Sequence, residues 1–287
     1  MSTSIPGLFR ALVDDAAVFP PGNSPLPDAV IGHARHREAW YGAAVGPLLV
    51  PAAAAVELLA QLDEDRWPGP GALGVAVVAR PGTDPVVLDE ALAVLTADPR
   101  VDVVGVELGW TAGWRRLGIP GELPLALEVP RGGPAQAEAI ADIRDSVAEG
   151  DTVVAKFRTG PTPRWPWPDE DELAGFLGTA TASPVPFRLT GGLHHAVRGT
   201  YAVAGEPEEN HGVLNVLVAT AAALDGAGVD ELAALLALRD AEPLAAVVAA
   251  WTSQTVHGVR TAWTAFGCCT VTDPLGELAA LDLLTAP

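Results

Sequence analysis

The chain has 287 residues, of which 49% are hydrophobic and 18% are charged, and its formal net charge is −19. This composition excludes a disordered protein, and an acidic chain without a Lys/Arg cluster argues against nucleic acid as a partner. No apolar run reaches the roughly 18 residues of a membrane span, and the N-terminus lacks the pattern of a secretory signal. We therefore expect a cytoplasmic protein with no membrane partner.

Short β-branched segments alternate with Ala/Leu-rich helical segments, a pattern typical of βα units around a parallel sheet. Eight segments are predicted as strands, and eight is the number that closes a barrel with a packed interior. The sequence therefore predicts an α/β protein with one (β/α)8 TIM-like barrel domain over residues 1–287, and a doubly wound open sheet is the alternative. The predicted strands are 16–19, 47–50, 74–79, 101–108, 123–129, 152–159, 186–190 and 266–271.

Prolines and aspartates precede most of the helical segments, as expected for residues that suit a first helical turn. The link at 111–122 is short for a full helix, and 245–262 is ambiguous, with a helix plus a hairpin as one interpretation. The predicted helices are 28–40, 52–62, 86–95, 135–148, 171–180, 211–224, 229–239 and 276–284.

Lys156 is the only lysine in a chain with sixteen arginines. Arginine stays protonated, whereas a desolvated lysine amine can lose its proton and act as a base or a nucleophile. Lys156 belongs to the sixth predicted strand, and barrel enzymes hold their active sites at the carboxyl ends of the strands. Arg158 shares its face, because side chains two residues apart on a strand point the same way. We predict Lys156 to be the central catalytic residue.

Acidic side chains from neighbouring strands are the natural partners of these two cations. Glu107 lies in the fourth predicted strand and Glu128 in the fifth, and a charge in a barrel interior is costly unless it is paired. A buried ion network with a purely structural role would have the same signature. The convergence of two acids and two cations at the strand ends favours a catalytic site.

The seventh predicted strand ends in Thr190-Gly-Gly192, followed by His194 and His195. The backbone amides of such a turn can approach an anion closely, which suits a phosphorylated substrate. His194 fits the role of a general acid or base. The residues expected to bind substrate are Arg80, Arg158, Arg188, Gly191, Gly192, His195 and His211.

A divalent metal ion is an alternative, because Glu107, Glu128, His194 and His211 carry suitable ligand atoms. The two cysteines are adjacent, at Cys268 and Cys269, which excludes a disulfide framework and a thiolate zinc site. The G-x-G-x-x-G letters at 69–74 precede a strand instead of following one, so they do not indicate a dinucleotide site. We therefore expect no cofactor, and on base rates a homodimer.

Around the sixth and seventh strands the sequence resembles class I aldolases of the deoxyribose-phosphate aldolase type. Lys156-Phe-Arg-Thr-Gly160 matches the K-x-x-T-G pattern of that family, and Arg188-Leu-Thr-Gly-Gly192 is similar to its K-x-S-G-G pattern. Val101-Asp102-Val-Val104 is similar to its V-D-V-V run, which contains an acid. The resemblance implies a barrel in which Lys156 forms an imine with a carbonyl substrate.

Two features depart from the aldolase pattern: Arg188 replaces the second lysine, and the two histidines after Gly-Gly are additional. The K-x-R-T-G and T-G-G-L-H-H segments together also resemble a family of bacterial and plant proteins, which leaves the reaction open.

Three functions follow from these observations. The first is a lyase in which Lys156, its pKa lowered by desolvation and by Arg158 and Arg188, forms an imine while Glu107, Glu128, Asp102 or His194 moves protons. The second is a metal-dependent hydrolase, isomerase or epimerase with Lys156 as acid or base. The third is a non-enzymatic protein that binds a small molecule.

Overall fold

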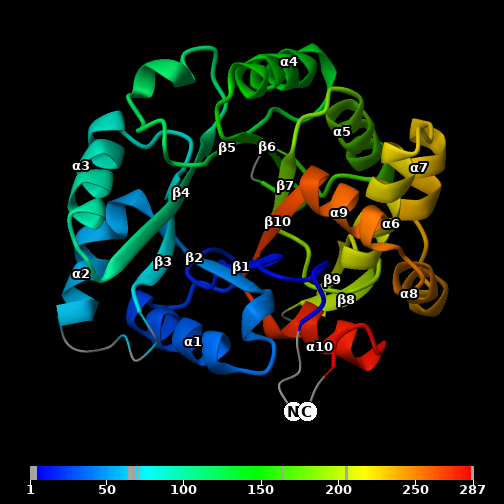
Figure 1. Ribbon diagram of the computed structural model, residues 1–287, viewed down its shortest axis with the longest axis horizontal. Coiled ribbons are helices and arrows are strands. Elements are labelled where there is room, and N and C mark those ends of the chain that lie inside the picture. The colour runs from blue at the N-terminus through cyan, green and yellow to red at the C-terminus, as the bar shows by residue number, and fades with distance from the viewer. Residues whose placement is uncertain are drawn as a thin grey trace.

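Eight parallel strands form a closed barrel surrounded by helices (Figure 1). The computed structural model describes residues 5–63, 67, 69, 71–162, 165–203 and 206–285. The order around the barrel is β1-β10-β7-β6-β5-β4-β3-β2, which confirms the predicted (β/α)8 fold and excludes the open sheet. The barrel strands are β1 Val13–Asp15, β2 Val45–Pro51, β3 Leu73–Ala79, β4 Val101–Gly109, β5 Leu125–Glu128, β6 Val153–Arg158, β7 Phe187–Thr190 and β10 Trp263–Cys268.

The first predicted strand was placed wrongly. The apolar run at 16–19 forms a turn, in which the Phe19 amide donates to the Ala16 carbonyl at 2.8 Å. The strand itself is Val13–Asp15, with two of its three residues acidic and all three buried. A strand this short with two aspartates has no apolar pattern by which it could be predicted. The last barrel strand also begins three residues before its predicted start.

The helices between the first strands lie outside the barrel, mostly where the sequence predicted them (Figure 1). α5 begins with a capping box in which Asp169 accepts from the Glu172 amide. The link after β4 holds only a short 3-10 turn among the described elements, as its length predicted. The helices are α1 Leu26–Glu38, α2 Ala55–Asp63, α3 Pro85–Thr96, α4 Gly133–Glu149 and α5 Glu170–Ala182, with 3-10 turns η1 Gly42–Ala44, η2 Ala52–Ala54 and η3 Trp114–Leu117.

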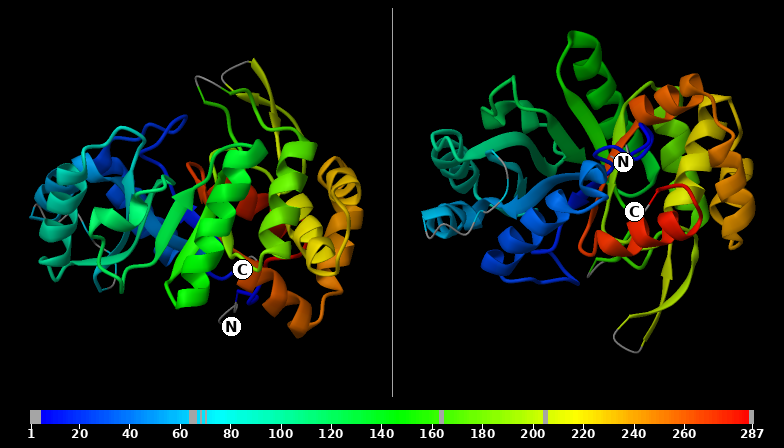
Figure 2. Two further views of the ribbon diagram at one scale, coloured as in Figure 1. Left: turned by 90° about the horizontal axis from the view of Figure 1, so that it is seen from above. Right: turned by 60° about the horizontal axis from the view of Figure 1, so that its bottom comes forward.

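The connection between β7 and β10 is much larger than one helix. It begins with an antiparallel hairpin, β8 Gly199–Val203 and β9 Glu206–Asn210, which projects from the barrel (Figure 2). The expected hairpin within 245–262 is wrong, because this region belongs to two helices. The remaining helices are α6 Val213–Leu224, α7 Val229–Leu236, α8 Ala241–Ala249, α9 Ser253–Ala262 and α10 Thr272–Ala280, the last of which begins four residues before its predicted start.

The aromatic packing between the barrel and α5 sets the orientation of β6. The Phe157 ring stacks on Phe176 of α5 with centroids 4.7 Å apart, and Phe176 meets Phe187 of β7 edge-on. All three rings are fully buried. Because side chains alternate along a strand, Phe157 on the outside places Lys156 and Arg158 on the inside of the barrel. In the described part of the chain, no helix is both long and apolar enough to cross a membrane.

Candidate active site

A cavity of about 600 Å³ opens at one end of the barrel, and every barrel strand contributes to its lining at or just beyond its carboxyl end. This is the end at which barrel enzymes hold their active sites. Seven of the residues predicted from sequence line the cavity: Arg80, Glu107, Glu128, Lys156, Arg158, Gly191 and His194.

Lys156 lies at the centre of an ion network in the barrel interior. Its Nζ atom donates to Glu107 Oε2 at 3.0 Å and lies 3.0 Å from Glu128 Oε2. Its side chain and that of Glu107 are almost completely buried, at 4% and 3% exposure. Arg158 donates from Nε to the other oxygen of Glu128 at 2.8 Å. The predicted pairing of two cations with two acids is therefore present.

Arg188 extends the network to a residue that the sequence analysis missed. Its guanidinium lies 3.1 Å from Glu107 Oε1 and forms an ion pair with Asp14 of β1. The sequence feature that could have indicated Asp14 is the pair of adjacent aspartates at the end of an apolar segment. Asp14 faces the interior, whereas Asp15 accepts on the outside from His33 of α1 at 3.0 Å. Arg188 is not among the residues that line the cavity, so its predicted contact with a substrate stays a prediction.

Positive and negative groups alternate through this network, which contains three carboxylates and three cations. Burial alone would raise the pKa of Glu128, but Lys156 and Arg158 outweigh it and hold the pKa at about 2. Burial alone would lower the pKa of Lys156, but the carboxylates of Glu107 and Glu128 raise it above the ordinary value. The expected lowering of the lysine pKa is therefore wrong for the unliganded site, and Lys156 is an ammonium ion at neutral pH.

His194 lines the cavity beside the end of β10. Its Nδ1 atom lies 3.1 Å from the hydroxyl of Thr270 and 3.6 Å from the sulfur of Cys268. Burial, with His195 next to it, lowers the pKa of His194, so the imidazole is neutral near pH 7. Cys269 also lines the cavity, and burial raises the pKa of its thiol, which leaves it protonated and a poor nucleophile.

The two glycine turns that follow β6 and β7 pack against each other. A Cβ on Gly160 would overlap the backbone of Gly191, and a Cβ on Gly192 would lie 2.9 Å from the Thr159 carbonyl. Gly191 and Gly192 both have positive φ, at 65° and 124°. These contacts give the Thr-Gly and Thr-Gly-Gly sequences a packing role. Gly191 reaches the cavity, but Gly192 is buried and is not among its lining residues.

Three of the predicted site residues lie elsewhere. Asp102 is exposed near the start of β4, paired in register with Gly74, because the site is built at the opposite ends of the strands. His195 turns away to Glu277 of α10 at 2.7 Å. His211 is fully buried, with Nε2 donating to the Pro168 carbonyl at 2.8 Å.

The predicted metal-ligand set is not assembled, because His211 is buried against the Pro168 carbonyl and does not line the cavity. Within the described ranges, no three His, Cys, Asp or Glu side chains are grouped so as to hold a metal ion.

No family model matches the chain, and no curated protein matches it. Among solved structures, the chain is similar to the catalytic domain of a hyperthermophilic chitinase from Pyrococcus furiosus. The identity is 13%, the alignment covers 69% of this chain and 87% of that chain, and the TM-score is 0.40. A similarity this distant says nothing about activity.

The arrangement combines an ammonium ion at the base of the cavity with a neutral imidazole at its side. Lys156 can donate a proton or a hydrogen bond to an oxygen atom, and His194 can accept a proton. Arg80 and Arg158 add positive charge to the wall. Such a set suits a reaction in which negative charge develops on a substrate oxygen.

Proposed function

We propose that this barrel is an enzyme that acts on a small anionic carbonyl compound, with Lys156 as the residue that engages the carbonyl oxygen. The observation that carries the proposal is the position of this single amine. It lies at the base of a cavity at the carboxyl ends of the strands, 4% exposed and 3.0 Å from each of two carboxylates.

The charge of the cavity wall supports an anionic substrate. The chain carries a net charge of −19, yet Arg80, Arg158 and Lys156 all line this cavity. Arg158 is neutralised by Glu128 at 2.8 Å. Arg80 is exposed and, among the described residues, its guanidinium contacts only the ring face of Phe19, 4.9 Å from the ring centre. A guanidinium that lines a cavity and has no carboxylate partner among the described residues favours a carboxylate or phosphate there.

The mechanism that fits these groups is cleavage of the bond between the α and β carbons of a β-hydroxycarbonyl compound. His194 takes the proton of a hydroxyl two carbons from the carbonyl carbon, and that hydroxyl becomes the carbonyl of one product. The electron pair of the broken bond moves to form the enolate of the other product. The Lys156 ammonium stabilises the enolate oxygen and supplies its proton. The neighbouring carboxylates keep the lysine charged between turnovers.

Imine formation at Lys156 is the second candidate, and one observation favours it. The lysine of the K-x-x-T-G segment faces the cavity, as the Schiff-base lysine of the aldolase pattern would. This route requires Lys156 to transfer a proton to Glu107 or Glu128 before the amine attacks the carbonyl carbon. The raised lysine pKa opposes that transfer until a substrate displaces a carboxylate.

The test is turnover of a panel of 2-oxo acids, hydroxy-2-oxo acids and sugar phosphates, followed by mass spectrometry. We expect cleavage of at least one hydroxy-carbonyl compound and a loss of about 100-fold or more in kcat/KM for Lys156→Met. Arg144→Met is the control, because Arg144 is an exposed cation whose ion pair in the described part of the chain is with Asp145 at the surface. Full turnover by Lys156→Met, or none by the wild type, would overturn the proposal.

Borohydride added during turnover separates the two routes. A stable mass gain on Lys156 indicates the imine route, and turnover without that gain indicates the ammonium route.

A further inference from the structure

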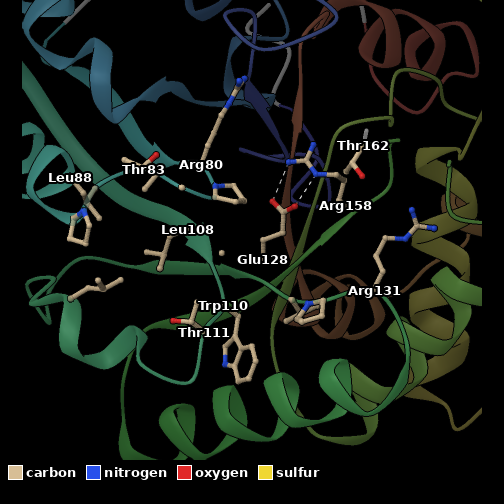
Figure 3. Close-up of a pocket in the computed structure, with 18 of the residues that line it drawn as sticks. Arg80, Thr83, Leu88, Leu108, Trp110, Thr111, Glu128, Arg131, Arg158 and Thr162 are labelled. Carbon is tan, nitrogen blue, oxygen red and sulfur yellow. Dashed lines mark hydrogen bonds and ion pairs between the residues drawn. The ribbon is translucent and has the colours of Figure 1, made fainter. Parts of the chain in front are cut away.

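The structure contains a second cavity, of about 680 Å³, whose lining is drawn in Figure 3. The two cavities share the residues at the ends of β3, β4 and β5, together with Arg158 of β6. The ion pair between Glu128 and Arg158 lines both cavities. Figure 3 shows the Arg158 guanidinium facing the Glu128 carboxylate within the second cavity. A ligand that extends from Lys156 across this ion pair therefore enters the second cavity.

The second cavity differs from the first in chemistry. The walls that it does not share are mainly apolar, from Leu88 of α3, Leu117 of η3, Val129 and the half-exposed ring of Trp165. Arg131 is the arginine of this cavity that does not also line the first one. Its guanidinium is already bound, with two hydrogen bonds to Glu172 at 2.7 and 2.8 Å and one to the Pro166 carbonyl. Such a cavity suits an uncharged hydrocarbon group.

The loop that forms one side of the second cavity is held firmly in place. The indole nitrogens of Trp110 and Trp114 both donate to Asp142 of α4, at 2.8 and 2.7 Å. Arg115 also binds this carboxylate, and these contacts lower its pKa despite partial burial. Figure 3 shows the Trp110 ring directed towards the helix and away from Arg80. The cavity is thus preformed, which reduces the entropic cost of binding.

Arg80 stands where the two cavities meet. It lines both, and in the described part of the chain its guanidinium has no ion pair or hydrogen bond. The other two cavity-lining arginines, Arg131 and Arg158, are each bound to a glutamate. An anionic group of a ligand would therefore bind at the junction, with the rest of the molecule extending to either side.

From this arrangement we infer that the substrate is a three-part molecule: a carbonyl group at Lys156, a carboxylate or phosphate at Arg80, and an apolar tail in the second cavity. The carbonyl assignment rests on the proposed function. The anion and the tail rest on the second cavity and on Arg80. The second cavity would then select among anionic carbonyl compounds by the size of their tails.

The binding test uses probes without a ketone or aldehyde group, so its outcome is independent of turnover. The dissociation constants of 3-phenylpropanoate and phenyl phosphate are measured by titration calorimetry, and the preferred probe identifies the anion. Acetate lacks the tail and 3-phenylpropan-1-ol lacks the charge. We expect the preferred probe to bind about ten-fold or more tightly than acetate, because burial of a phenyl ring is worth at least that factor. We expect a similar advantage over the alcohol, because a charge-assisted hydrogen bond to Arg80 is worth about 1.5–3 kcal/mol.

Three variants locate the binding. Thr83→Trp places an indole in the second cavity and is expected to weaken the probe about ten-fold, whereas Thr96→Trp, at the exposed end of α3, is expected to leave it unchanged. Arg80→Ala is expected to remove the advantage of the probe over the alcohol. Equal affinity for acetate and the preferred probe, or an unchanged affinity in Thr83→Trp, would overturn the inference. Probe binding without turnover on any carbonyl compound would instead refute the proposed function alone.

Discussion

Replacement of Lys156 by methionine tests whether the interior network depends on balanced charge. The variant keeps much of the side-chain volume but leaves three carboxylates facing two cations. Breaking a buried ion pair by removing one partner costs about 3–5 kcal/mol. Here Glu107 keeps Arg188 at 3.1 Å and Glu128 keeps Arg158 at 2.8 Å. We therefore expect a loss near the lower limit, about 3 kcal/mol in the free energy of unfolding at pH 7.

The same variant should respond to pH in a characteristic way. With Lys156 absent, a carboxylate of the network takes up a proton more readily in the folded state than in the unfolded state. As the pH falls, the folded variant then binds more protons than the unfolded variant does. The difference in free energy of unfolding between wild type and variant should therefore shrink between pH 7 and pH 5.

Urea denaturation followed by circular dichroism at both pH values measures this effect. The double variant Lys156→Met/Glu107→Gln should be less destabilised than the sum of its single variants, by about 1 kcal/mol or more, because the two side chains are in contact. Arg144→Met serves as the exposed control. A loss below about 1 kcal/mol for Lys156→Met, or strict additivity in the double variant, would refute the reasoning.

Two further predictions concern residues outside the network. Burial, with the charge of Arg198 nearby, lowers the pKa of His211 to about 4. As the pH falls, the unfolded chain therefore takes up this proton before the folded chain does. The contribution of the neutral His211 side chain to the free energy of unfolding is fully present above pH 6.5. It is lost as the pH falls towards 4, and the loss is roughly 3 kcal/mol. Titration of the His211 imidazole by NMR checks this prediction, and a titration midpoint near pH 6.5 would contradict it. Gly160→Ala is expected to destabilise by about 2 kcal/mol, because its Cβ would overlap the Gly191 backbone. Gly276→Ala is the helical control with open space around its Cβ, and equal melting temperatures for the two variants would contradict the packing role.

Local sequence patterns were sufficient for most of the barrel. Alternation of short β-branched runs with Ala/Leu-rich segments predicted eight strands, and proline and aspartate marked where helices begin. Apolar patterns did not reveal β1 and β9, because two of the three residues of β1 and three of the five residues of β9 are acidic. Strand β1 is a buried strand only because the rest of the barrel surrounds it and Arg188 neutralises Asp14.

The sequence by itself determined the fold class and the centre of the candidate site. The period of two along β6 places Lys156 and Arg158 on one face, and strand order brings Glu107 and Glu128 to them. Only the tertiary structure decided which other polar residues join them. Asp102 lies at the wrong end of its strand, and His195 follows a turn that directs it to α10. The direction of the lysine pKa shift was also a tertiary outcome, because it depends on whether carboxylates or guanidinium groups lie nearest to the amine, and sequence spacing does not measure that distance.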